Sequence, residues 1–117
     1  MKYMKEITVV ELQNRLKARK EGKDEFHLLD VRLPNEVAIA TIPGSDLLIP
    51  IQELPNRVSE LDAWKNDGTD LLIFCRSGNR SGTACNLLES HGFHNTFNVK
   101  GGVLAWSDQV DNTVKKY

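Results

Sequence analysis

The chain has 117 residues, of which 40% are hydrophobic and 26% are charged, and its formal net charge at neutral pH is -1. This composition is that of an ordinary folded protein, which excludes a disordered chain, and the length predicts a single domain over residues 1–117. Lysine and arginine are scattered along the chain, so we expect no nucleic-acid partner, and no apolar run approaches the roughly 18 residues that span a bilayer.

Short apolar runs alternate with segments of helical period along the chain, which is the pattern of an α/β domain built on a parallel sheet. Residues 6–22 (EITVVELQNRLKARKEG) predict a short strand followed by a helix, because Thr8 and Glu11 have the spacing of a capping box. Residues 26–31 (FHLLDV) predict a buried central strand with Asp30 at its carboxyl end.

The rest of the chain repeats this alternation of helices and strands. The expected elements are a helix at 34–40 (PNEVAIA), a strand at 46–50 (DLLIP), a helix at 51–64 (IQELPNRVSELDAW), a strand at 70–75 (DLLIFC), a helix at 80–91, a strand at 96–99 (TFNV) and a helix from residue 101 (GGVLAWSDQV). The chain is therefore predicted to form five strands and about five helices.

The motif that carries chemistry is the loop at residues 75–81 (CRSGNRS). Cys75 stands at the carboxyl end of the predicted fourth strand, where ligand sites of open parallel sheets lie. The amides of a tight glycine-containing loop, together with the amino terminus of the next helix, favour an anion, and a thiolate is one. Since a free cysteine has a pKa of about 8.5, we expect these groups and the guanidinium groups of Arg76 and Arg80 to keep Cys75 ionised.

The remaining loop residues are candidates for binding an anionic substrate. They are Arg76, Ser77, Gly78, Asn79, Arg80 and Ser81. The two arginines present planar forks that suit an oxyanion, although Arg76 can also be a solvated surface residue and Arg80 an ion pair at the helix start. Both serines offer hydroxyl groups, but Ser81 equally suits an ordinary helix start. Gly78 is expected to supply a positive φ angle.

The chain resembles the rhodanese family of single-domain sulfurtransferases. The resemblance runs through ITVVEL, LLDVRLPNE, IPGSDLLIP, LLIFCRSGNRSGTACNLLESHGF and VKGGVLAW, and so covers nearly the whole chain. It implies a rhodanese-like α/β fold, with a central five-stranded parallel sheet flanked by helices on both faces and the active cysteine at Cys75. One difference is that family members often carry Gly-His before the IPGA-like segment, where this chain has Ala40 and Thr41.

The resemblance also implies a double displacement without a cofactor. The Cys75 thiolate would take the outer sulfur of thiosulfate or a similar small anionic donor and become a persulfide, while sulfite leaves. A thiol, cyanide or a sulfur-carrier protein would then accept the sulfur. The carboxyl-terminal segment is similar to rhodanese-like domains that pass sulfur to a carrier for molybdopterin synthesis or tRNA thiolation. We expect a cytoplasmic protein, because the first ten residues lack the apolar core of a secretion signal.

Two other functions are open on the sequence. Protein tyrosine phosphatases and the related arsenate reductases also use a loop with cysteine and arginine, but five residues separate the two there, whereas four separate Cys75 from Arg80. A non-catalytic binding module is the other alternative, because a fold does not fix a function. In that case Cys75→Ser would leave the biological role unchanged.

Residues outside the loop are expected to support it. Asp30 and Arg32 form a DVR motif, and Glu36 lies four residues after Arg32, so a short helix would join Arg32 and Glu36 in a structural ion pair. Gly101 and Gly102 permit a tight turn into the last helix, beside the active loop.

The two cysteines are expected to be free thiols, with Cys85 acting as a small buried residue. A zinc site would have to combine Cys75 and Cys85 with His91 and His94, and these spacings are unlike those of structural zinc sites. We therefore expect no bound metal.

Overall fold

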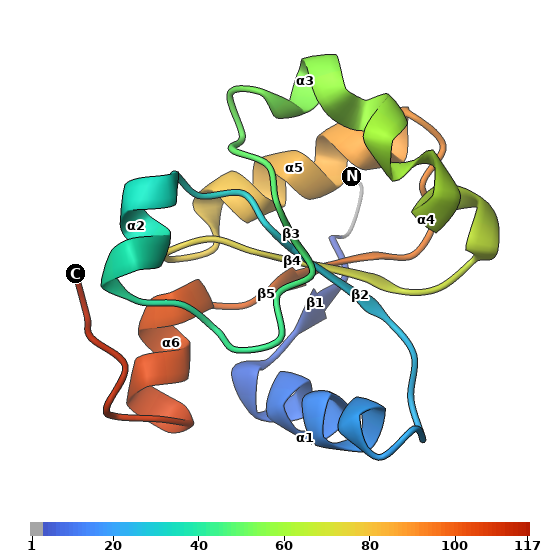
Figure 1. Cartoon of the computed structure of the whole chain (residues 1–117). Coiled ribbons are helices and arrows are strands. Elements are labelled where there is room, and N and C mark those ends of the chain that lie inside the picture. Colours follow the sequence, from blue (N-terminus) through green and yellow to red (C-terminus); the bar gives the residue numbers. More distant parts are fainter. Residues whose placement is uncertain (1–3) are drawn as a thin grey trace.

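The computed structural model describes residues 4–117, and its centre is a parallel sheet (Figure 1). The five strands of this sheet are β1 (Glu6–Ile7), β2 (His27–Asp30), β3 (Leu47–Leu48), β4 (Leu71–Phe74) and β5 (Thr96–Val99). They lie in the order β1-β5-β4-β2-β3, and every neighbouring pair is parallel. The predicted five-stranded parallel sheet is therefore confirmed.

Helices connect the strands. They are α1 (Val9–Lys20), α2 (Pro34–Ile39), α3 (Leu54–Arg57), α4 (Asp62–Asp67), α5 (Asn79–Ser90) and α6 (Gly102–Gln109), with a 3-10 helix η1 (Val58–Leu61) between α3 and α4. The capping box predicted for the first helix is present, since the Thr8 hydroxyl accepts from the Glu11 amide and the Glu11 carboxylate accepts from the Thr8 amide. None of the helices in residues 4–117 is long and apolar enough to cross a membrane.

The single helix predicted over residues 51–64 is wrong. The chain there forms α3, η1 and α4 in succession. Val58 and Leu61 lie three residues apart, and both are buried against the sheet. A 3-10 helix has three residues per turn and stacks such a pair on one side, so the apolar spacing suits it as well as an α-helix.

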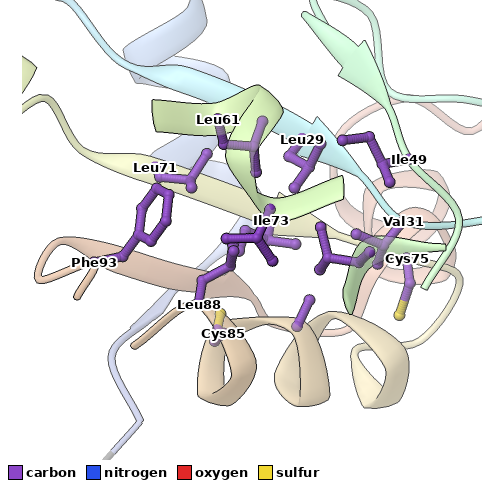
Figure 2. Packing of buried hydrophobic residues seen from close by; sticks show 13 residues of the cluster. Leu29, Val31, Ile49, Leu61, Leu71, Ile73, Cys75, Cys85, Leu88 and Phe93 are labelled. Carbon is purple, nitrogen blue, oxygen red and sulfur yellow. The ribbon is translucent and has the colours of Figure 1, made fainter. Parts of the chain in front are cut away.

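Both faces of the sheet are covered. Leu29 of β2 and Ile73 of β4 pack into one apolar cluster with residues of α3, η1 and α5, and Cys75 and Cys85 belong to this cluster (Figure 2). Leu28 and Leu72, the adjacent residues on the same strands, pack into a second cluster with α1 and α6. Successive side chains of a strand point to opposite faces, so the predicted helices on both faces are confirmed.

The carboxyl ends of the central strands bring the sequence motifs to one edge of the sheet. In the register of β2 and β4, Asp30 pairs with Phe74, the residue before Cys75. On the other side of β4, Ile73 pairs with Asn98 of β5. Helix α5 begins at this same edge, directly after the loop. Open parallel sheets bind ligands at this edge, so the fold positions Cys75 for chemistry.

Candidate active site

Cys75 is the candidate nucleophile, and its sulfur accepts hydrogen bonds from the loop that follows it. The Cys75 Sγ lies 3.1 Å from the Gly78 amide nitrogen and 3.4 Å from the Ser81 amide nitrogen. The Ser81 Oγ lies 3.3 Å away. Gly78 has a φ of +107° and is the N-cap of α5, which turns the loop amides inward as predicted. The loop is therefore a nest of donors around one sulfur atom.

These contacts favour the thiolate. Burial alone raises the pKa of the Cys75 thiol, because the residue is only 1% exposed. The contact with the Ser81 hydroxyl and the hydrogen bonds from the amides of Ser81, Gly78 and Ser77 outweigh burial and hold the pKa below its usual value. The contacts of the sulfur with Ser81, Gly78 and Ser77 are the largest causes of this lowering, and the positive charge of Arg80 also interacts with Cys75.

Asn98 of β5 is a site residue that the sequence did not single out. Its Oδ1 accepts from the Ser81 hydroxyl at 2.6 Å, and its Nδ2 donates to the Gly78 carbonyl at 3.0 Å. Asn98 is buried, and it thus fixes two of the residues whose groups contact the Cys75 sulfur, Ser81 and Gly78. A polar residue inside a short buried strand was the one available signal, because such a side chain needs hydrogen-bond partners.

Ser81→Ala is expected to raise the pKa of the Cys75 thiol, because it removes a hydroxyl that can turn its one proton from the Asn98 Oδ1 to the ionised sulfur. A raised thiol pKa means less thiolate at neutral pH. The rate of alkylation by iodoacetamide, measured against pH, should therefore shift to higher pH and be several-fold slower at pH 7. Ser90→Ala is the matched control, since the Ser90 hydroxyl bonds to the Leu87 carbonyl at the far end of α5. An unchanged alkylation profile in Ser81→Ala would show that the hydroxyl does not act on the sulfur.

The predicted ion pair between Arg32 and Glu36 is wrong. The Glu36 carboxylate instead accepts hydrogen bonds from both terminal nitrogens of Arg80, from Nη1 at 2.6 Å and from Nη2 at 2.7 Å. Arg32 is fully buried and pairs with Asp30, with Nη2 2.8 Å from Oδ2. The spacing argument requires both residues to be on one helix, but α2 begins at Pro34, so Arg32 precedes it.

Glu36 connects α2 to the start of α5. The Arg80 guanidinium, its strongest partner, lowers the pKa of Glu36 to about 2, with further hydrogen bonds from the Tyr117 hydroxyl and the Leu33 amide. Arg80 thus forms an ion pair with Glu36 at the start of α5, which is the alternative to anion binding that the sequence left open. Its two terminal nitrogens face a carboxylate, which leaves Arg76 as the arginine with less of its charge offset.

The outer rim of the loop is formed by Arg76, Ser77 and Asn79, which are exposed. Behind the loop, the first turn of α6 holds its backbone. The Val103 amide donates to the Cys75 carbonyl at 3.0 Å, and the Leu104 amide donates to the Arg76 carbonyl at 3.1 Å.

The two glycines at the start of α6 have positive φ angles, +77° for Gly101, the N-cap, and +56° for Gly102, the first residue of the helix. They place the amino terminus of α6 directly against the loop. Among residues 4–117, no group of three or more His, Cys, Asp or Glu side chains could hold a metal ion.

The fold and the site together define a parallel α/β protein with a buried cysteine in an anion-binding loop between a strand and a helix. Comparison with known proteins gives the family. The model of the rhodanese-like domain matches residues 11–109. The chain therefore belongs to the rhodanese-like domain family.

Relatives agree with this assignment. A sulfurtransferase of Allochromatium vinosum is 36% identical over 92 residues, which cover 79% of this chain and 81% of that protein. The rhodanese-like/PpiC domain-containing protein 12 of Arabidopsis thaliana is 33% identical over 114 residues. The match covers 97% of this chain but only 38% of that protein. An adenylyltransferase and sulfurtransferase of Zea mays, MOCS3-2, is 38% identical over 87 residues, covering 72% of this chain and 18% of that protein.

A solved structure gives the same result for the fold. The rhodanese-like domain protein from Staphylococcus aureus matches with a TM-score of 0.74 and 31% sequence identity, over 97% of this chain and 99% of that chain. The family and the sulfurtransferases among the relatives support sulfur transfer as the general activity of the chain.

Proposed function

We propose that the chain takes a sulfane sulfur from thiosulfate, or from a similar small anionic donor, onto Cys75 and passes it to a thiophilic acceptor. The observation that carries this proposal is the set of hydrogen bonds at the Cys75 sulfur, which lowers the pKa of a buried thiol. A thiolate at this position is a nucleophile whose negative charge is already stabilised before the donor binds.

The first step forms one sulfur–sulfur bond and breaks another. The Cys75 thiolate attacks the outer sulfur of thiosulfate, the bond between the two sulfur atoms of thiosulfate breaks, and sulfite leaves with the bonding electron pair. We assign capture of the donor to Arg76, because it is exposed at the rim and its Nη1 and Nη2 have no partner within residues 4–117. The negative charge on the new persulfide stays close to the loop amides of Gly78 and Ser81 that contact the Cys75 sulfur.

The second step returns the enzyme to its starting state. The persulfide carries its terminal sulfur within reach of the loop amides, which stabilise charge on it as they stabilise the thiolate. The acceptor attacks this terminal sulfur, and the electron pair of the breaking bond returns to Cys75. The acceptor class is a thiol, cyanide or a sulfur-carrier protein. The match to MOCS3-2 favours the carrier protein, since that relative joins an adenylyltransferase to a sulfurtransferase.

The site supports a phosphatase or an arsenate reductase less well. Four residues rather than five separate Cys75 from Arg80, and both terminal nitrogens of Arg80 already bind Glu36. A phosphate held in the loop would have to compete with this carboxylate for the same donors. A purely non-catalytic module gives no reason for the donors that converge on the sulfur.

The proposal is tested by incubating the purified protein with thiosulfate and measuring the intact mass. We expect one added sulfur atom per chain, located on Cys75 by peptide mapping and removed by cyanide or a thiol. Sulfate, which has no transferable sulfur, is the control and should add nothing. If thiosulfate and other sulfane donors all leave Cys75 unmodified, the chain is not a sulfurtransferase of this kind.

A further inference from the structure

Tyr117 contacts Arg76 directly and reaches Arg80 through Glu36. Its hydroxyl donates to the Glu36 Oε2 at 2.8 Å and accepts from the Arg32 Nη1 at 2.9 Å. Its backbone carbonyl accepts from the Arg76 Nε, and its ring centroid lies 5.4 Å from the Arg76 guanidinium. Figure 1 shows the carboxyl-terminal end of the chain beside α2 and α6, close to the loop that leads into α5.

The contacts of Tyr117 restrain Arg76 directly. The carbonyl holds Nε and the ring lies near the guanidinium, so the planar group is fixed while Nη1 and Nη2 keep their donors. A guanidinium presents paired donors to an oxyanion only when its plane is oriented. An exposed arginine without such contacts would sample many rotamers, and an anion would have to order it on binding.

The contacts of Tyr117 restrain Arg80 through Glu36. The Glu36 carboxylate receives the Tyr117 hydroxyl on Oε2, the same atom that accepts from the Arg80 Nη2. Arg32 extends this network to Asp30, because its Nη1 donates to the Tyr117 hydroxyl while its Nη2 and Nε donate to the Asp30 carboxylate. One aromatic side chain thereby joins the Asp30–Arg32 pair to the Glu36–Arg80 pair.

We propose that Tyr117 is a positioning residue of the sulfur-transfer site, which orients Arg76 for capture of an anionic sulfur donor and steadies the Glu36–Arg80 pair beside it. This inference rests on the proposed function for the identity of the donor. The electrostatic part of it, an oriented guanidinium beside Cys75, holds for any anion that approaches the thiolate. Tyr117 touches neither the sulfur nor the donor in this mechanism.

The test compares an anionic with a neutral reagent at the same thiol. Iodoacetate and iodoacetamide alkylate Cys75 by the same displacement, so the ratio of their rates at one pH cancels differences in thiolate fraction and in access. Tyr117→Ala should lower the iodoacetate-to-iodoacetamide ratio about fivefold, the effect of leaving one arginine side chain to be ordered by the anion. The same variant should raise the KM for thiosulfate by a similar factor with little change in kcat.

Two further variants make the test specific. Tyr117→Phe and Tyr117→Ala both keep the backbone carbonyl that binds Arg76, but Tyr117→Phe also keeps the ring and loses only the hydroxyl, so it should lower the ratio less than Tyr117→Ala. Lys115→Ala changes an exposed residue of the same segment and should leave the ratio unchanged.

The outcomes separate this inference from the proposed function. If Tyr117→Ala slows both reagents equally, or changes neither, the positioning role is refuted. If the wild-type protein is not loaded by any sulfane donor but the ratio still falls in Tyr117→Ala, the assigned donor is wrong while the role of Tyr117 stands.

Discussion

Cys75→Ser is expected to abolish sulfur loading from thiosulfate and to reduce sulfur transfer to the uncatalysed rate. The substitution keeps nearly the same shape, so the donors from Gly78 and Ser81 remain in place around an oxygen. A serine hydroxyl is not ionised at neutral pH and cannot form a persulfide, so the first step has no nucleophile. Intact-mass measurement after thiosulfate treatment, together with a continuous assay of sulfite release, checks both parts.

Cys85→Ala is the matched control for this experiment. Cys85 lies on α5 in the same apolar cluster as Cys75 (Figure 2), it is 1% exposed, and burial raises the pKa of its thiol to about 12. A buried protonated thiol is a poor nucleophile, so the variant should load sulfur at close to the wild-type level. If sulfur loading survived in Cys75→Ser but were lost in Cys85→Ala, the nucleophile would be Cys85 and the assignment to Cys75 would be wrong.

The loop could be predicted from the sequence because its physics is local. A buried strand, a cysteine, a glycine and a helix follow one another within residues 71–90, and the chain itself dictates that the loop amides turn toward Cys75. The burial of Cys85 was predictable for the same reason, since helical period alone places it near the inner face of α5.

The partners of the charged residues could not be predicted in this way. Arg80 binds Glu36, which is 44 residues away in the sequence, and Ser81 binds Asn98, which is 17 residues away. Tyr117 reaches Arg32 across 85 residues. Such pairs depend on which strands are neighbours in the sheet and on where the end of the chain packs, and neither follows from the spacing of residues within one helix.

Gly102→Ala is expected to destabilise the protein severely and to disrupt the loop. Gly102 has a φ of +56°, and a Cβ built there would lie 2.3 Å from the Cys75 carbonyl oxygen and 2.7 Å from the Arg76 carbonyl oxygen. These atoms are backbone, so neither can move aside without shifting the loop that holds the thiolate. The free energy of unfolding, measured by urea denaturation, should fall by well over the ~1–2 kcal/mol that a left-handed conformation alone costs a residue with a Cβ.

Gly68→Ala separates the clash from the backbone conformation. Gly68 has a φ of +71°, but a Cβ there would meet no atom within 4 Å, so this variant carries only the conformational cost. It should lose about 1 kcal/mol of stability and keep full sulfur loading. If Gly102→Ala were no more costly than Gly68→Ala and still loaded sulfur, the close approach of α6 would not be what shapes the loop. The amides of Val103 and Leu104 reach the carbonyls of Cys75 and Arg76 only because residue 102 has no side chain, so we expect stability and sulfur loading to be lost together.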